Sequence, residues 1–216
     1  MKTLLLMRHA KSSWKDPDIA DHDRPINKRG RNDAPLMGSL LVERELVPQR
    51  ILSSSAARAS QTAELVIEAI GKEVGLDMQV AFLDRLYMAE PPEIYEELRA
   101  LPDDLERVMI IGHNPGLETL LQMLSSRIES LPTAVIAHLV LPIDSWAQLS
   151  STVTGELIDI WRPKQLREEI EEEEKAEKEK AKAKEKEKEK EKEKEKEKAK
   201  DKSKGKDKPK GKGKKK

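Results

Sequence analysis

Short apolar runs alternate with amphipathic segments from the start of the chain to Trp161. A compact aliphatic run bounded by polar residues is typical of a strand that is buried on both faces of a sheet. The first four such runs predict strands at Thr3–Met7, Arg50–Ser53, Met78–Leu83 and Arg107–Ile111. Three later runs predict closing strands at Ala134–Leu141, Ser145–Val153 and Leu157–Trp161.

The segments between these runs carry apolar residues at helical spacing. Asn27 belongs to the residue types that cap helix N-termini, so we expect a helix from this position to about Glu45. A second helix is predicted from Ala56 to about Ile70, followed by Gly71 as its end. Two further helices are predicted after Pro91, to about Leu101, and over Gly116–Ser125.

Strands and helices thus follow one another in alternation. This order predicts an α/β fold, a three-layer α/β/α sandwich with a mostly parallel central sheet. The run of strands near the end of the pattern has no helix between its members, so we expect an antiparallel edge there.

Basic side chains and imidazoles follow three of the predicted strands. Arg8 and His9 come directly after the first strand, Arg58 after the second, and His113 after the strand at Arg107–Ile111. Ligands of open parallel sheets bind outside the carboxyl ends of the strands. An arginine fork binds phosphate oxygens in a bidentate manner, and a neutral imidazole is a competent nucleophile. The strand ends therefore predict a site that handles phosphate.

The charge of the chain is unevenly distributed. The whole chain has 41 Lys+Arg and 41 Asp+Glu, a formal net charge of zero. Residues 1–162 nevertheless carry −7 and residues 163–216 carry +7, with +8 in the last 18 residues. Such an asymmetry indicates an acidic folded domain and a basic C-terminal segment.

The composition excludes several classes of protein. There is no cysteine, which excludes disulfides, thiolate metal sites and a cysteine nucleophile. No apolar run approaches the ~20 residues that a helix needs to cross a bilayer. The run after Lys2 is too short for a signal-peptide core. We therefore expect a cytoplasmic protein without a transmembrane segment.

The apolar pattern stops at Pro163, where a Lys/Glu-rich low-complexity segment begins. Strict alternation of Lys and Glu places like charges at i,i+4, which disfavours a helix. We therefore predict a folded domain over residues 1–162 and a disordered tail with transient helix over residues 163–216. Two roles for the tail stay open: a solubilising segment, or a binding segment for an anionic partner (nucleic acid, a membrane surface or an acidic protein).

Five stretches of the chain resemble the histidine phosphatase superfamily, to which the cofactor-dependent phosphoglycerate mutases belong, and within it the SixA-like phosphohistidine phosphatases. They are Leu4–Trp14, which contains a variant of the Arg-His-Gly signature, and Asp23–Gly30, Asp33–Gly38, Ile51–Ala63 and Gly112–Glu118. The resemblance extends to about residue 162 and implies a phosphoglycerate-mutase-like fold.

The resemblance implies a role for several residues. His9 would be the nucleophile that becomes phosphorylated, and Arg8, Arg58 and His113 would bind the phosphoryl oxygens. Neither a metal nor an organic cofactor is implied. The residues expected to contact substrate beside this set are Lys11, Ser12 and Asn114. The triplet from Asp21 to Asp23 has no second ligand cluster, so we interpret it as a solvated acidic loop and not a metal site.

A general acid is the least defined part of the expected site. Asp84 and Glu90 are the candidates, although neither lies in a motif that resembles the family. A phosphohistidine substrate needs less help than an ester, because imidazole is a better leaving group than an alkoxide.

Three functions are compatible with these observations. The first is hydrolysis of phosphohistidine, carried by a protein, through a phospho-His9 intermediate. The second is hydrolysis of a small phosphomonoester by an enzyme of the same superfamily. The third is a scaffold or binding protein that acts through its basic tail, and the complete set of Arg8, His9, Arg58 and His113 argues against it.

Overall fold

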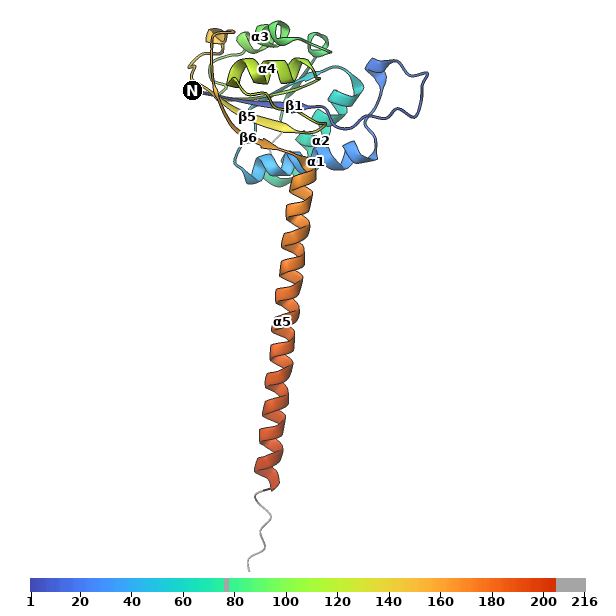
Figure 1. Cartoon of the computed structure of the whole chain (residues 1–216), viewed down its shortest axis with the longest axis vertical. Helices are drawn as coiled ribbons and strands as arrows, with labels where there is room; N and C mark the ends of the chain where they lie inside the picture. The colour runs from blue at the N-terminus through green and yellow to red at the C-terminus, as the bar shows by residue number, and fades with distance from the viewer. Residues whose placement is uncertain (76–77, 205–216) are drawn as a thin grey trace, which may run out of the picture. The chain divides into compact units, whose positions relative to one another are not determined.

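The computed structural model describes residues 1–75 and 78–204 (Figure 1). The chain divides into two compact units, Met1–Leu166 and a second unit that begins at Arg167. The boundary that the sequence predicts at residue 162 stays a prediction. No helix among the described residues is long and apolar enough to cross a membrane.

The first unit is built on a six-stranded sheet with the order β3-β2-β4-β1-β5-β6. The three strand pairs β1–β4, β2–β4 and β2–β3 are parallel, whereas β1–β5 and β5–β6 are antiparallel. The mostly parallel sheet with an antiparallel edge is therefore confirmed. The strands are β1 (Lys2–Arg8), β2 (Arg50–Ser54), β3 (Val80–Leu83), β4 (Arg107–Gly112), β5 (Ile136–Leu141) and β6 (Glu156–Trp161).

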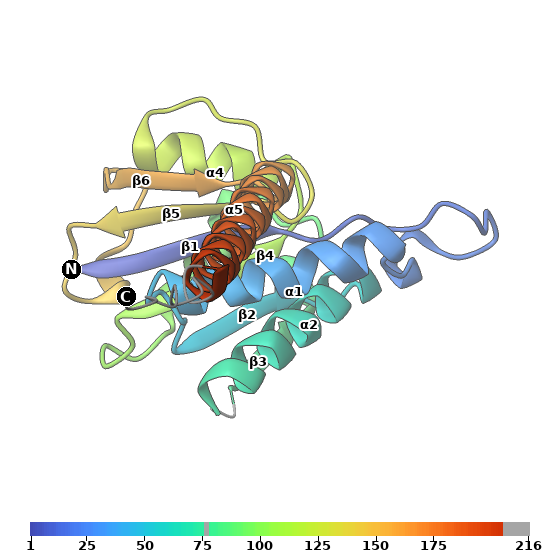
Figure 2. The same ribbon diagram turned by 90° about the horizontal axis from the view of Figure 1, so that it is seen from below.

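Helices cover both faces of this sheet. The pair α1 and α2 packs together on one face, and α3 and α4 lie over the other (Figures 1 and 2). This arrangement is the predicted three-layer α/β/α sandwich. The helices are α1 (Lys28–Glu43), α2 (Ala57–Val74), α3 (Pro91–Arg99) and α4 (Gly116–Ser125), joined by the 3₁₀ turns η1 (Asp21–Asp23), η2 (Asp84–Leu86) and η3 (Trp146–Gln148).

Strand β1 shows why its sequence is a continuous aliphatic run. Leu4 and Leu6 belong to the hydrophobic cluster on the α3/α4 face, whereas Leu5 and Met7 belong to the cluster on the α1/α2 face. Successive side chains of a strand point to opposite faces, so a strand in the middle of two layers needs apolar residues at every position. Its Arg8 stands at the end of the run, where the strand leaves the core.

Two of the expected helix boundaries depend on single residues. Asn27 caps α1, because its side chain accepts a hydrogen bond from the backbone N–H of Gly30 at 3.0 Å. The predicted end of α2 at Gly71 is wrong, since the helix continues to Val74. Gly75, which has φ of 69°, supplies the left-handed conformation that ends it.

The predicted strand at Ser145–Val153 is also wrong. This segment begins with the 3₁₀ turn η3, in which the Ser145 side chain accepts a hydrogen bond from the N–H of Ala147. Trp146 is fully buried and donates its indole N–H to the carbonyl of Leu105 at 2.7 Å. The apolar residues of this segment therefore anchor a connection to the core and do not extend the sheet.

The segment predicted as a disordered tail forms a helix, α5 (Pro163–Lys204), over its described part. Its first half does not alternate strictly, and Glu174 pairs with Lys178 one turn later at 2.9 Å. Ala, Glu and Lys are also strong helix formers. The prediction that this segment is disordered, with transient helix, stays a prediction. Residues 205–216 of the predicted tail lie outside the described residues.

Candidate functional site

The carboxyl ends of β1, β2 and β4 meet at one pocket. Arg8, His9, Arg58 and His113, the four residues expected from these strand ends, all line it. Because β1 and β4 are paired in parallel, with Arg8 opposite Gly112, the residues that follow the two strands come together. The substrate-contact candidates Lys11, Ser12 and Asn114 line the same pocket.

His9 is held with one ring nitrogen protonated. Its Nδ1 lies 2.8 Å from the carbonyl oxygen of Ala10, which can only accept, so Nδ1 carries the hydrogen and Nε2 keeps a lone pair. Burial, together with the charges of Arg58 and Arg8, lowers the pKa of His9 to about 4 against the opposing effect of the hydrogen bond to the Ala10 carbonyl. His9 is therefore a neutral imidazole near pH 7, the form that can act as a nucleophile.

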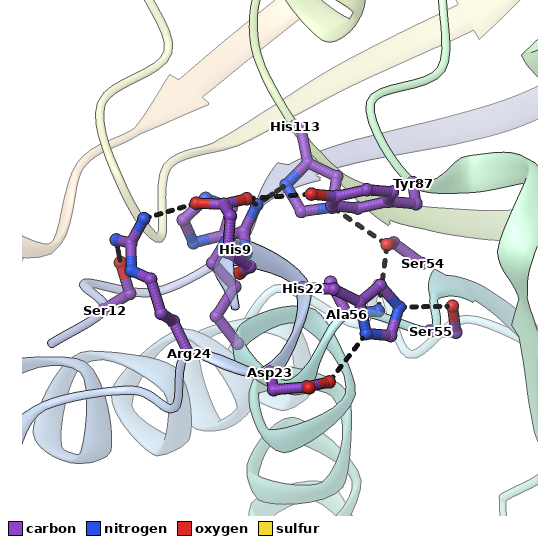
Figure 3. A network of polar contacts seen from close by, with 12 residues as sticks. His9, Ser12, His22, Asp23, Arg24, Ser54, Ser55, Ala56, Tyr87 and His113 are labelled. Atoms are coloured by element: carbon purple, nitrogen blue, oxygen red, sulfur yellow. Dashed lines mark hydrogen bonds and ion pairs between the residues drawn. The ribbon is translucent and has the colours of Figure 1, made fainter. Parts of the chain in front are cut away.

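His113 lies beside His9, with 5.1 Å between the ring centroids (Figure 3). Its Nδ1 accepts from Arg58 Nη2 at 3.3 Å, and its Nε2 therefore donates to the Ser54 hydroxyl at 2.8 Å. Burial lowers the pKa of His113 to about 3, helped by His9 and Arg58. Ser54 thus fixes the ring and the tautomer of His113.

Arg8 is oriented from the opposite side by the segment that precedes β5. Its Nη1 donates to the carbonyl of Leu131 at 3.0 Å, which also accepts from Asn114 Nδ2 at 3.0 Å. Glu118 accepts from the N–H of Leu131 at 2.7 Å and so holds this peptide in place. Among the described residues, the buried Arg8 Nε and Asn114 Oδ1 have no hydrogen-bond partner.

Arg58 contacts a carboxylate that sequence reasoning missed. Its Nη1 donates to the carbonyl of Asp21 at 2.6 Å and its Nη2 to Asp21 Oδ2 at 3.0 Å. The Tyr87 hydroxyl donates to the same oxygen at 2.9 Å, and Arg24 pairs with Oδ1. Burial raises the pKa of Asp21, but the Tyr87 hydrogen bond and the two arginine charges outweigh burial and lower it below its ordinary value.

The two general-acid candidates do not reach this pocket. Asp84 lies in η2 and Glu90 precedes α3, and both side chains are exposed to solvent outside the lining residues. The backbone N–H of Glu90 donates to Glu93 at 3.1 Å, which fits a helix-capping role. The carboxylate that the structure places in the pocket is that of Asp21.

The segment predicted as a solvated acidic loop therefore has two different parts. Asp23 is exposed and pairs with His22 Nδ1 at 3.0 Å, and His22 Nε2 lies 3.1 Å from the Ser55 hydroxyl (Figure 3). Asp21 instead faces the pocket. The one feature of the sequence that points to Asp21 is its i,i+3 spacing to Arg24, and this spacing is too common to identify a site.

The pocket as a whole is cationic. Its lining includes Arg8, Lys11, Arg24 and Arg58 against the single carboxylate of Asp21, and both of its histidines are neutral near pH 7. Such a surplus of positive charge suits a phosphoryl dianion. The described residues contain no group of three His, Asp or Glu side chains that could hold a metal ion.

A model of the histidine phosphatase superfamily (branch 1) matches residues 4–138. The chain belongs to this superfamily. The matched region spans β1 to β5 and contains every strand-end residue of the pocket. A relative in Mycobacterium tuberculosis, the uncharacterized protein Rv1276c, is 36% identical over 120 residues, which are 56% of this chain and 70% of the relative.

Two solved structures have the same fold. A protein assigned as phosphohistidine phosphatase SixA from Nakamurella multipartitia is 26% identical, with a TM-score of 0.65 over 75% of this chain and 96% of that one. A second protein with this assignment, from Agrobacterium tumefaciens, is 29% identical, with a TM-score of 0.62 over 75% of this chain and 98% of that one. The predicted family and branch are thus those of its structural neighbours.

Proposed function

We propose that the protein is a phosphohistidine phosphatase that acts through a covalent phospho-His9 intermediate. The observation that carries this proposal is the neutral His9, whose Nδ1–H is bound by the Ala10 carbonyl while Nε2 keeps its lone pair in a cationic pocket. The likeness to proteins assigned as SixA supports phosphohistidine as the substrate class.

In the first step, the Nε2 lone pair of His9 attacks phosphorus while the bond from phosphorus to the substrate imidazole breaks. Arg8 and Arg58 bind the phosphoryl oxygens and stabilise the charge that is spread over them during transfer. The incoming dianion offsets the burial and the cations that lower the pKa of His113. His113 therefore takes up a proton from solvent as the substrate binds, donates it in a hydrogen bond to phosphate, and returns it to solvent when phosphate leaves.

In the second step, water attacks phosphorus and the bond from phosphorus to His9 Nε2 breaks. The electron pair returns to Nε2, while Nδ1 keeps its proton through the Ala10 carbonyl. Both protons of the water leave with the product as dihydrogen phosphate. His9 is thereby regenerated as the same neutral tautomer, and neither step requires a metal ion.

The pocket mouth would hold the rest of the substrate. Lys11, Ser12 and Asn114 are proposed contacts there, because they line the pocket beside the phosphoryl-binding residues. The Ser12 hydroxyl accepts from Arg24 Nη2 at 2.8 Å, so its position is already defined.

Trapping of the intermediate tests the nucleophile. We expect quenching in alkaline detergent during turnover of ³²P-phosphohistidine to leave an alkali-stable, acid-labile label on the wild-type protein and none on His9→Ala. His22→Ala is the matched control, since His22 lies outside the pocket lining and should keep the label. A label that persists in His9→Ala would exclude His9 as the nucleophile.

Side-by-side turnover of phosphohistidine and of a small alkyl phosphate tests the substrate class. We expect a higher kcat/KM for phosphohistidine. A higher kcat/KM for the alkyl phosphate would instead assign the protein as a small-molecule phosphomonoesterase. No turnover of either compound, with folding intact, would favour the scaffold function.

A further inference from the structure

Asp21 is the single carboxylate among the described residues that line the pocket, and its environment is unusual for a surface acid. It lies in η1, and donors from three separate segments converge on its two oxygens. Arg24 binds Oδ1, whereas Arg58 and the Tyr87 hydroxyl bind Oδ2. These contacts fix the position of a negative charge next to Arg58, which also contacts the nucleophile's neighbour His113.

This carboxylate keeps room for one more donor. Two carboxylate oxygens offer about four acceptor positions, and the contacts above use three of them. The remaining position is on Oδ1, and the Asp21 side chain is 49% exposed although its partners Arg24 and Arg58 are buried. A donor on a bound substrate can therefore reach Asp21 without displacing any of its present partners.

The same contacts determine what Asp21 does with protons. Two arginines and a hydroxyl stabilise the ionised carboxylate, which can accept a hydrogen bond but has no proton to give. An alkyl phosphate ester needs an acid, because its leaving alkoxide must be protonated. The carboxylate of the pocket is thus unable to supply the proton that hydrolysis of an alkyl ester requires.

Phosphohistidine has the complementary chemistry. When the ring nitrogen that does not bear phosphorus is protonated, the ring is an imidazolium and departs as neutral imidazole. When that nitrogen is not protonated, the ring departs as an imidazolide anion, a far poorer leaving group. A carboxylate that binds this N–H stabilises the reactive protonated form and needs no proton of its own.

We propose that Asp21 binds the N–H of the imidazolium leaving group and thereby selects phosphorus–nitrogen over phosphorus–oxygen substrates. In this step the bond from His9 Nε2 to phosphorus forms and the bond from phosphorus to the ring nitrogen breaks. The electron pair of the broken bond stays on the ring, which leaves neutral with its proton still on the nitrogen that faces Asp21. This inference rests on the proposed function.

A purely structural role for Asp21 makes a different prediction. If Asp21 served only to hold Arg58, its removal would weaken phosphoryl binding and would reduce turnover of every phosphorylated compound by the same factor. A contact with the leaving group affects only substrates that leave as a protonated ring. The two roles are therefore separated by a ratio of specificity constants, which is insensitive to the fraction of folded enzyme.

The experiment compares full-length wild type with Asp21→Asn on two substrates, phosphohistidine and p-nitrophenyl phosphate. Nitrophenolate leaves without a proton, so it reports on the phosphoryl site alone. We expect the ratio of kcat/KM for phosphohistidine to that for p-nitrophenyl phosphate to fall about 10- to 100-fold, the range of one charge-assisted hydrogen bond. Asp21→Glu, which keeps the charge, should restore a part of the ratio.

Asp23→Asn is the matched control. Asp23 lies in the same 3₁₀ turn, pairs with His22 and does not line the pocket, so its substitution should leave the ratio unchanged. Provided that wild type hydrolyses phosphohistidine, an unchanged ratio in Asp21→Asn would overturn the inference, whether or not both activities fall. A wild-type enzyme that does not hydrolyse phosphohistidine would instead overturn the proposed function.

Discussion

The two sides of the pocket differ in burial and in origin. The side formed by the strand ends, with Arg8, His9, Arg58 and His113, is largely buried, and its two histidines are neutral. The side formed by the η1 segment carries an ionised, half-exposed Asp21. The difference teaches that the buried strand ends and the exposed η1 segment can serve two separate properties, reactivity and selectivity. Under the functions proposed above, burial prepares His9 to attack any phosphoryl group, whereas the exposed charge of Asp21 selects the leaving group.

The largest expected effect of this difference is on stability against pH. Both buried histidines have a pKa below the 6.5 of an exposed histidine, about 4 for His9 and about 3 for His113. Between pH 4 and 6.5 the unfolded chain therefore binds more protons, so the free energy of unfolding must rise with pH across this window. Each histidine therefore makes the free energy of unfolding lower at pH 5 than at pH 7, by on the order of 2 kcal/mol.

Urea unfolding of wild type and His113→Asn at pH 5 and pH 7 measures this contribution. We expect the difference in the free energy of unfolding between the two pH values to be smaller in the variant, because one of the two groups has been removed. An identical difference in both proteins would show that His113 is protonated equally in the folded and unfolded states.

The second prediction compares the two arginines that hold Asp21. Arg58 also lies against His113 and is proposed to bind phosphate, whereas Arg24 contacts Asp21 and Ser12. We expect Arg58→Lys to lower kcat/KM about 100-fold, because lysine lacks the bidentate fork. Arg24→Lys should cost about 10-fold or less on p-nitrophenyl phosphate. Equal losses in the two variants would contradict a division between the sides.

A smaller effect is expected at two of the three serines of the Ser53–Ser55 run. Ser54 positions His113, whereas Ser55 contacts His22 on the η1 side. Loss of one hydrogen bond to a buried ring predicts about a 10-fold decrease in kcat for Ser54→Ala, with recovery in Ser54→Thr. Ser55→Ala should change kcat less than about 2-fold. A failure of threonine to restore kcat would indicate that Ser54 acts through packing alone.

The smallest effect is expected for the C-terminal segment. Every residue that lines the pocket lies in the unit Met1–Leu166, and the second unit begins at Arg167. A chain that ends at Leu166 should therefore keep kcat/KM for phosphohistidine within about 2-fold, since separate compact units keep their own cores. A large loss in steady-state assays would show that the charged segment takes part in substrate binding.

The sequence predicted the fold and the strand-end side of the pocket because both are local signals. The aliphatic run of β1 is typical of a strand between two layers, and Arg8 and His9 follow it directly. The wrong predictions concern segments whose local pattern is compatible with more than one structure. Gly71 resembles a helix end, but α2 continues to Val74, and Trp146 belongs to a 3₁₀ turn.

The sequence by itself thus determined a mostly parallel α/β/α sandwich, a cationic set of strand-end residues and membership of a superfamily. Only the tertiary structure decided which carboxylate enters the pocket. The sequence offers Asp84 and Glu90 as candidates, but Asp21 is the carboxylate that contacts Arg58, 37 residues away, and Tyr87, 66 residues away. Contacts between residues so far apart in the sequence depend on how the loops return over the sheet. No local pattern along the chain predicts the course of these loops.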